Sequence, residues 1–291
     1  MLVEMDLNTL TSKTLARLPA AALGFSGLLA LPACHAETLP LWEVGAGLSV
    51  LSMPDYRGSD LTDTHLLPVP YLVYRGELLK ADEGGLRGRL FKSERLEAHI
   101  SLNGTLPALD DDNPARQGMD ELKPTAELGP TADMHLWRSA DRRMRLDLRL
   151  PVRTAITVES DPRQIGWLFS PNLIFETRDP AGLAGWNFSV QGGPYFNDRE
   201  YNAYFYSVNP AEATATRPAY EAAGGYSGSQ FMVTLTKRFP SHWVGGYVRY
   251  DNLSGAVYAD SPLVETEHAV AGGVAVSWIF GESSRRVETD D

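Results

Sequence analysis

The chain has 291 residues, a formal net charge of −11 and 43% hydrophobic residues. This acidic balance, without a basic cluster or an arginine-rich tail, argues against nucleic-acid binding. The length allows one large β-domain or two ordinary domains. Frequent aromatic, glycine and proline residues suit many strands that are joined by tight turns.

The N-terminal segment has the features of a secretory signal peptide. Basic residues precede a short apolar stretch, residues 20–31, and small residues follow it. The stretch is too short for a membrane-spanning helix. We therefore predict cleavage between Ala36 and Glu37, with residues 1–36 as the signal.

Cys34 is the only cysteine of the chain. It is either a lipidated residue of a lipoprotein box or a small residue at the −3 position of an ordinary cleavage site. In both cases the exported chain has no disulfide. No apolar segment after residue 36 has the length of a transmembrane helix. If this chain enters a membrane, it does so as a closed barrel, whose ladder hydrogen bonds satisfy the backbone.

Most of the remaining chain divides into segments in which apolar and polar side chains alternate, as they do on the two faces of a strand. In chain order, the predicted strands are residues 41–52, 66–75, 77–91, 94–105, 125–137, 142–158, 164–178, 186–197, 230–239, 242–253 and 265–280. Dividing residues 77–91 at the turn signal 82–85 gives twelve strands, an even number as in bacterial single-chain barrels. Ten strands, with one pair folded inward or lost, is the alternative.

The clearest alternation lies in residues 142–158. Every second residue from 144 to 158 is apolar except Thr154, whereas most positions between them are charged: Arg143, Arg145, Asp147, Arg149 and Arg153. An aliphatic outer face and a charged inner face are typical of a lipid-exposed barrel strand beside a polar lumen. The segment is also longer than the usual strand of a soluble protein.

The charged inner face has two interpretations. It lines an anion-selective channel, or it belongs to a packed interior, because the lumen of a barrel with ten to twelve strands is narrow. In the second case the arginines pair with acids on neighbouring strands, which avoids unpaired buried charges. The candidate acids are Glu127, Asp133, Glu176 and Asp251.

Loop lengths alternate along the predicted strands, as in outer-membrane barrels. The segments predicted to be extracellular are long, and those predicted to be periplasmic are tight turns: 106–123, 199–228 and 254–264 against 139–141, 179–182 and 240–241. We therefore predict an all-β fold, a transmembrane antiparallel β-barrel with a polar, charged lumen in a Gram-negative type outer membrane. The barrel covers residues 37–280, and residues 281–291 form a short tail.

Several motifs, in order, resemble the MipA/OmpV family of outer-membrane proteins. Its opening motif is matched by Pro54, Asp55, Tyr56, Arg57, Gly58, Ser59 and Asp60. Later landmarks lie in residues 67–75, 204–226 and 260–263, so the resemblance spans residues 42–280. One departure is the tail, because such barrels commonly end on a terminal aromatic residue and this chain continues past Phe280.

The resemblance implies a non-enzymatic scaffold for cell-wall machinery. The family is named for a protein that binds a murein-hydrolysing lytic transglycosylase and a bifunctional murein synthase. The alternative, from the arginines themselves, is a narrow channel or a barrel that binds a small solute. Both an open lumen and a filled lumen are compatible with the sequence.

Three further groups of residues have both a functional and a purely structural interpretation. The 54–60 motif contacts a ligand or partner, or it is a loop held by its own Asp–Arg pair and a turn at Gly58. The aromatic segment 199–228 forms a binding surface or folds back over the barrel mouth. His99 and Ser101 share the inner face of one strand, but no catalytic or metal-binding motif is present. We therefore expect no enzymatic activity and no cofactor.

Overall fold

The computed structural model describes residues 38–82, 85–105 and 113–288. They belong to one compact unit, Glu37–Asp291. The predicted cleavage site at Ala36 and Glu37 lies outside the described residues, as does Cys34.

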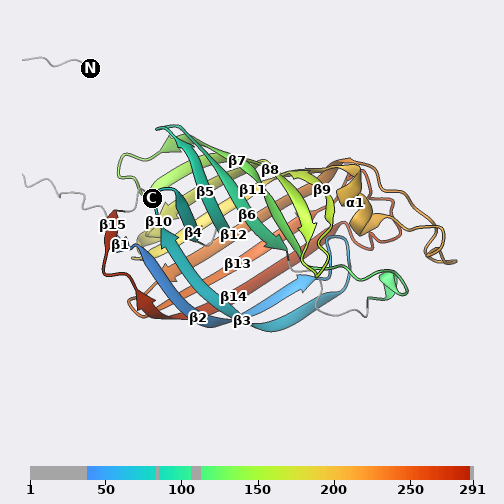
Figure 1. The fold of residues 1–291 in the computed structure, drawn as a ribbon, viewed down its shortest axis with the longest axis horizontal. Helices are drawn as coiled ribbons and strands as arrows, with labels where there is room; N and C mark the ends of the chain where they lie inside the picture. The colour runs from blue at the N-terminus through green and yellow to red at the C-terminus, as the bar shows by residue number, and fades with distance from the viewer. Residues whose placement is uncertain (1–37, 83–84, 106–112, 289–291) are drawn as a thin grey trace, which may run out of the picture. The chain divides into compact units, whose positions relative to one another are not determined.

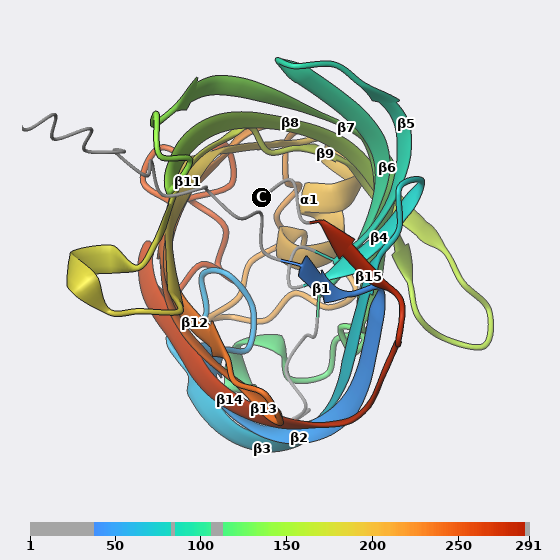
Figure 2. The same ribbon diagram turned by 90° about the vertical axis from the view of Figure 1, so that its left-hand side faces the viewer.

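One antiparallel sheet forms the wall of a barrel (Figures 1 and 2). Its strands are β2 (Trp42–Pro54), β3 (Thr62–Arg75), β4 (Leu79–Asp82), β5 (Gly85–Lys92), β6 (Leu96–Thr105), β7 (Thr125–Arg138), β8 (Met144–Thr157), β9 (Gln164–Phe169), β10 (Asn172–Arg178), β11 (Trp186–Asn197), β12 (Gly225–Arg238), β13 (His242–Asn252) and β14 (His268–Glu282). Strands that follow one another in the chain are neighbours in the sheet, and β14 pairs with β2 to close the ring.

The wall contains twelve strands, because β9 and β10 form one interrupted strand. Both pair with β8, β9 near its end and β10 near its beginning. Ser170 and Pro171 separate them, and Pro171 has no N–H to donate to a ladder. The predicted division of residues 77–91 is confirmed, since β4 and β5 are separate strands.

The two faces of the strands follow the predicted alternation. On β8, Arg153 and Thr157 are buried, whereas Val152 is exposed. On β14, Ala271 and Ser277 are buried, whereas Val270 and Trp278 point out of the barrel and are exposed. The outer surface is therefore an apolar band and the interior is polar, as a barrel in lipid requires.

The two ends of the barrel differ. One end, which we call the loop end, carries the long connections, including α1 (Arg199–Tyr206) and the 3-10 helix η1 (Pro114–Arg116). The opposite end, the turn end, carries the tight turns, among them η2 (Pro180–Gly182). Within the described residues, no helix combines the length and the apolar character needed to cross a membrane.

A small second sheet lies at the turn end, where β1 (Thr38–Pro40) pairs with β15 (Arg286–Glu288). Figure 2 looks onto this end and shows both strands in front of the barrel opening. β14 continues to Glu282, so the wall runs two residues past Phe280. The tail then turns back, and Leu41 N donates to the carbonyl of Arg285 at 2.9 Å.

We predict that Gly47→Val disrupts the closure between β2 and β14. A Cβ at Gly47 would lie 2.1 Å from the carbonyl oxygen of Val276 and 2.6 Å from the Cα of Ser277. Overpacking against the backbone should lower the free energy of unfolding by about 2 kcal/mol or more. The measurement is a urea titration in lipid vesicles.

Gly88→Val is the matched control, because a Cβ there meets no described atom within 4 Å. It should change the free energy of unfolding by no more than about 0.5 kcal/mol. Equal effects of the two substitutions would contradict the steric explanation.

Candidate functional site

The 54–60 motif bends into the barrel at the loop end. Arg57 Nε donates to Asp251 Oδ1 at 3.1 Å, and Arg57 Nη1 donates to the carbonyl of Ser227 at 3.3 Å. The guanidinium also lies over the ring of Tyr195, 4.6 Å from its centroid. Burial alone would lower the pKa of Arg57, but the neighbouring Tyr258 and Asp251 raise it above its ordinary value. Arg57 therefore stays charged and holds the motif against β12 and β13.

The partner of Arg57 differs from the pair expected within the loop. Its carboxylate comes from Asp251 on β13, which the motif reaches only in the closed barrel. Asp55 instead accepts a hydrogen bond from Asn113 Nδ2 at 2.6 Å, which joins the motif to η1. The turn at Gly58 is present, with a φ of +105°, and the Gly58 carbonyl accepts from Glu265 N at 2.7 Å.

An aromatic cluster covers the motif at the loop end. The rings of Tyr206 and Tyr258 stack with centroids 3.8 Å apart, and Tyr56 packs edge-on against Tyr206. Tyr206 OH donates to the Arg57 carbonyl at 2.8 Å. Asp198 caps α1 by accepting from Tyr201 N at 2.8 Å, which sets the direction of Tyr206. Of the two interpretations of segment 199–228, the structure shows the one that folds over the barrel mouth.

Ion pairs across neighbouring strands occupy the lumen beneath this cluster. Arg153 lies 3.6 Å from Glu127, and Arg149 lies 2.8 Å from Asp133. Nearer the turn end, Arg145 lies 2.6 Å from Glu176.

The other two charged residues predicted for the lumen are Asp147, between Arg145 and Arg149 on β8, and Arg143. Asp147 Oδ1 is 2.8 Å from His135 Nδ1. Arg143 precedes β8 at the turn end, and its side chain is 59% exposed and 3.8 Å from Asp179. Arg143 is therefore a rim residue rather than part of the packed interior.

His99 and Ser101 interact with separate partners. Ser101 Oγ lies 2.8 Å from Thr131 Oγ1 and accepts from Arg153 Nε at 2.9 Å. His99 Nδ1 lies 3.9 Å from Asp133 Oδ2. Across the described ranges, no hydrogen bond joins the serine to the histidine, so a nucleophile and base are not assembled here. The same residues contain no group of three or more His, Cys, Asp and Glu that could hold a metal ion.

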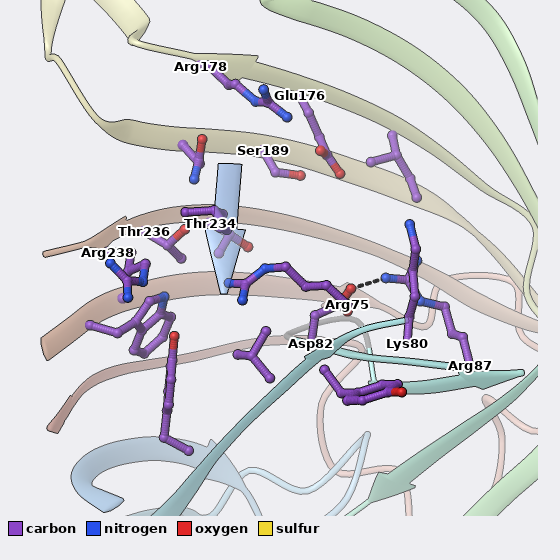
Figure 3. A pocket seen from close by; sticks show the side chains of 18 of the residues that line it. Arg75, Lys80, Asp82, Arg87, Glu176, Arg178, Ser189, Thr234, Thr236 and Arg238 are labelled. Atoms are coloured by element: carbon purple, nitrogen blue, oxygen red, sulfur yellow. Dashed lines mark hydrogen bonds and ion pairs between the residues drawn. The ribbon is translucent and has the colours of Figure 1, made fainter. Parts of the chain in front are cut away.

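The lumen of the turn-end half contains a cavity of about 1380 Å³, which we call the luminal cavity. Figure 3 shows Lys80, Arg87 and Arg178 among its lining residues, with Asp82 forming an ion pair with Arg87. Within the described part of the chain, no carboxylate pairs with Lys80 or Arg178. Both side chains face the luminal cavity.

The walls of the luminal cavity differ in character. Polar, uncharged side chains line it on β11 and β12: Asn187, Ser189, Gln191, Thr234 and Thr236. Apolar and aromatic side chains line it on β3 and β13, including Val69, Tyr71 and Trp243. The rings of Tyr71 and Trp243 have centroids 6.3 Å apart.

A buried carboxylate, that of Glu43, joins three residues that line the luminal cavity. Glu43 is fully buried and accepts from Arg75 Nη1, Arg238 Nε and Tyr71 OH, each at 3.0 Å. Tyr71 and Arg75 lie in the family landmark 67–75, but no functional role was predicted for them or for Glu43, Arg238, Lys80 and Arg178. Arg178 could have been found, because it shares the inner parity of Glu176 on the predicted strand 164–178. For Glu43, the only signal in the sequence is a charged residue on the polar face of the predicted strand 41–52.

The family model described as "MltA-interacting protein MipA" matches residues 46–280. The chain belongs to the MipA/OmpV family. Outer membrane protein OmpV of Vibrio cholerae is 26% identical over 213 residues, which cover 71% of this chain and 76% of OmpV. Outer membrane protein Omp26La of Vibrio anguillarum is 27% identical over 214 residues, with the same coverage. This member of the family is thus an outer-membrane β-barrel.

Solved structures of outer-membrane proteins also match. An outer membrane channel from Pseudomonas putida F1 is 13% identical with a TM-score of 0.45, and the match covers 84% of this chain and 98% of the channel. The CymD monoaromatic hydrocarbon channel is 11% identical with a TM-score of 0.29, covering 84% of this chain and 89% of that chain.

We predict that Arg57→Ala opens the loop end of this MipA/OmpV-family barrel. The substitution removes the ion pair to Asp251 and the contact with Tyr195, so the motif loses its anchor. In planar lipid bilayers, the unmodified protein should pass no steady current, whereas R57A should give discrete current steps.

Arg199→Ala is the matched control, because Arg199 lies at the same end but pairs with Glu221 at the surface, where its side chain is 62% exposed. R199A should stay silent. A silent R57A would show that the seal does not depend on Arg57.

Proposed function

We propose that this barrel binds small anionic solutes, carboxylates or phosphates, in the luminal cavity and does not form a steadily open channel. The observation that carries the proposal is the pair of cations, Lys80 and Arg178, which face the luminal cavity without an acidic partner among the described residues. The proposal assigns the protein no catalytic step.

The charge balance of the luminal cavity supports an anionic ligand. Although the whole chain has a formal net charge of −11, eleven arginines and one lysine line the luminal cavity against four carboxylates. Several of these arginines are neutralised by acids behind them, such as Arg149 by Asp133. The remaining positive charge sits in a recess with low-dielectric walls, which concentrates anions.

The packing of the lumen supports binding rather than conduction. Above the luminal cavity, the contacts of Arg57 with Asp251 and Tyr195 fill the interior, and the stacked Tyr206 and Tyr258 lie over them. A solute would thus reach the luminal cavity from the turn end, the end predicted to face the periplasm. There, β1 and β15 contribute Leu39 and Val287 to its lining.

We predict that Lys80→Gln and Arg178→Gln each weaken the binding of succinate or inorganic phosphate. The expected loss is about tenfold in Kd, the equivalent of about 1.4 kcal/mol for one charge-assisted hydrogen bond. The measurement is isothermal titration calorimetry on the protein in nanodiscs, at low salt and repeated at high salt.

Lys237→Gln is the control, because Lys237 belongs to β12 but donates to the carbonyl of Ala184 at the turn rather than lining the luminal cavity. K237Q should bind both anions as the unmodified protein does. An unmodified protein that gives no binding heat with either anion would contradict the proposed function.

A second candidate function is a scaffold for murein enzymes, favoured by the description of the matching family model as an MltA-interacting protein. The surface that supports this role is the turn end, where β1 and β15 form a two-stranded sheet in which Thr38, Arg286 and Glu288 are exposed. We predict that crosslinking in intact cells joins this end to a lytic transglycosylase or a murein synthase. Recovery of neither enzyme would count against the scaffold.

A further inference from the structure

One edge of the barrel wall has no hydrogen-bonded neighbour over most of its length. β3 pairs with β2 along the whole strand, from Thr62 to Tyr74. On its other side, β3 pairs with β4 only at Tyr74 and Arg75. Among the described strands, none pairs with the β4-facing edge of residues 64–72, which we call the β3 seam. It lies on the side of the barrel that faces the viewer in Figure 1.

Two prolines of β3, Pro68 and Pro70, lie within the β3 seam. Arg75 N donates to the Leu41 carbonyl at 2.7 Å, on the β2 side. Because the backbone groups of a strand alternate in direction, the odd-numbered residues of β3 face β2 and the even-numbered residues face the seam. Pro68 and Pro70 are even-numbered, and a proline has no N–H. They therefore remove two unpaired donors from this edge, which is where a sheet tolerates proline.

An unpaired edge at membrane depth is tolerated only where it is buried in protein or lines a water-filled cavity. The luminal cavity meets this requirement, because Val69 and Tyr71 of β3 line it from one side of the seam. Asp82 of β4 and Arg87 of β5 line it from the other side. The outward-facing Leu72 of the same strand is 59% exposed on the lipid side. The seam is thus the part of the wall where the luminal cavity adjoins the bilayer.

The luminal cavity offers two chemistries next to this seam. Lys80 and Arg87 provide positive charge on β4 and β5, and Arg178 provides more on β10. Tyr71 of β3 and Trp243 of β13 provide an apolar surface. A ligand that uses both has an anionic head and an apolar chain, and such a molecule dissolves in the bilayer rather than in water.

We propose that the β3 seam is a lateral entry through which amphipathic anions pass from the bilayer into the luminal cavity. The head group binds at Lys80 and Arg178, and the chain lies along Tyr71 and Trp243. This inference rests on the proposed function and names the ligand class and its route.

The test uses two photoreactive acids with the same diazirine group, one on a dodecanoate chain that partitions into lipid and one on a water-soluble butyrate. The protein, purified from outer membranes, is reconstituted in vesicles, irradiated with each acid over time and mapped by peptide mass spectrometry. We expect dodecanoate to label peptides that contain Tyr71 and Trp243, and butyrate to label the same peptides.

Two substitutions separate entry from binding. Val69→Trp places an indole inside the barrel at the seam. Met232→Trp places one in the same luminal cavity on β12, where both edges of the strand are paired. V69W should slow dodecanoate labelling of the lumen about tenfold relative to M232W, as adding about 1.4 kcal/mol to the entry barrier would do. Butyrate labelling should be equal in the two variants.

The outcomes distinguish the two proposals. If butyrate labels the lumen and dodecanoate labels only outward-facing residues, the lateral entry is wrong and the proposed function stands. Equal dodecanoate rates in V69W and M232W would likewise overturn the lateral entry. If neither acid labels the lumen, the proposed function fails and this inference fails with it.

Discussion

Hydrogen bonding of the backbone within the wall is the constraint on which the rest of this barrel depends. Lipid offers no partner to a peptide group, so β14 must return to β2 and pair with it along the strand. Gly45 and Gly47 allow this approach, because a Cβ at either position would meet the backbone of β14 at about 2 Å. Where the pairing stops, along the β3 seam, the chain places prolines on the strand and a polar cavity behind it.

The charged side chains of the interior have different surroundings in the two halves of the barrel. In the loop-end half, Asp251 is 1% exposed and lies between two arginines, Arg57 of the 54–60 motif and Arg249 of its own strand β13. This arrangement avoids the cost of an unpaired buried charge. In the turn-end half, Lys80 and Arg178 face the luminal cavity and have no carboxylate partner among the described residues.

The two ends of the barrel differ in the contacts that cover them. The loop end is bridged by contacts between segments far apart in sequence, whereas the turn end carries the short sheet of β1 and β15. Membership in the MipA/OmpV family establishes the outer-membrane location and the β-barrel fold. Many different sets of luminal side chains are compatible with such a barrel. The chemistry of this lumen, cationic on one wall and apolar on another, is therefore the property that distinguishes what the chain can bind.

The sequence by itself determined most strands of the wall and their faces, and it favoured twelve strands over ten, because side-chain alternation is a local property with a period of two residues. Residues 142–158 indicated a strand with one charged face, the other strands and the loop lengths indicated a barrel around it, and the turn signal near Asp82 indicated the twelfth strand. Only the tertiary structure decided which charges meet. Arg57 and Asp251 are 194 positions apart, and Glu43 reaches Arg238 across 195. Such pairs, the luminal cavity and the β3 seam depend on how the strands are staggered when the barrel closes, and local alternation carries no information about that stagger.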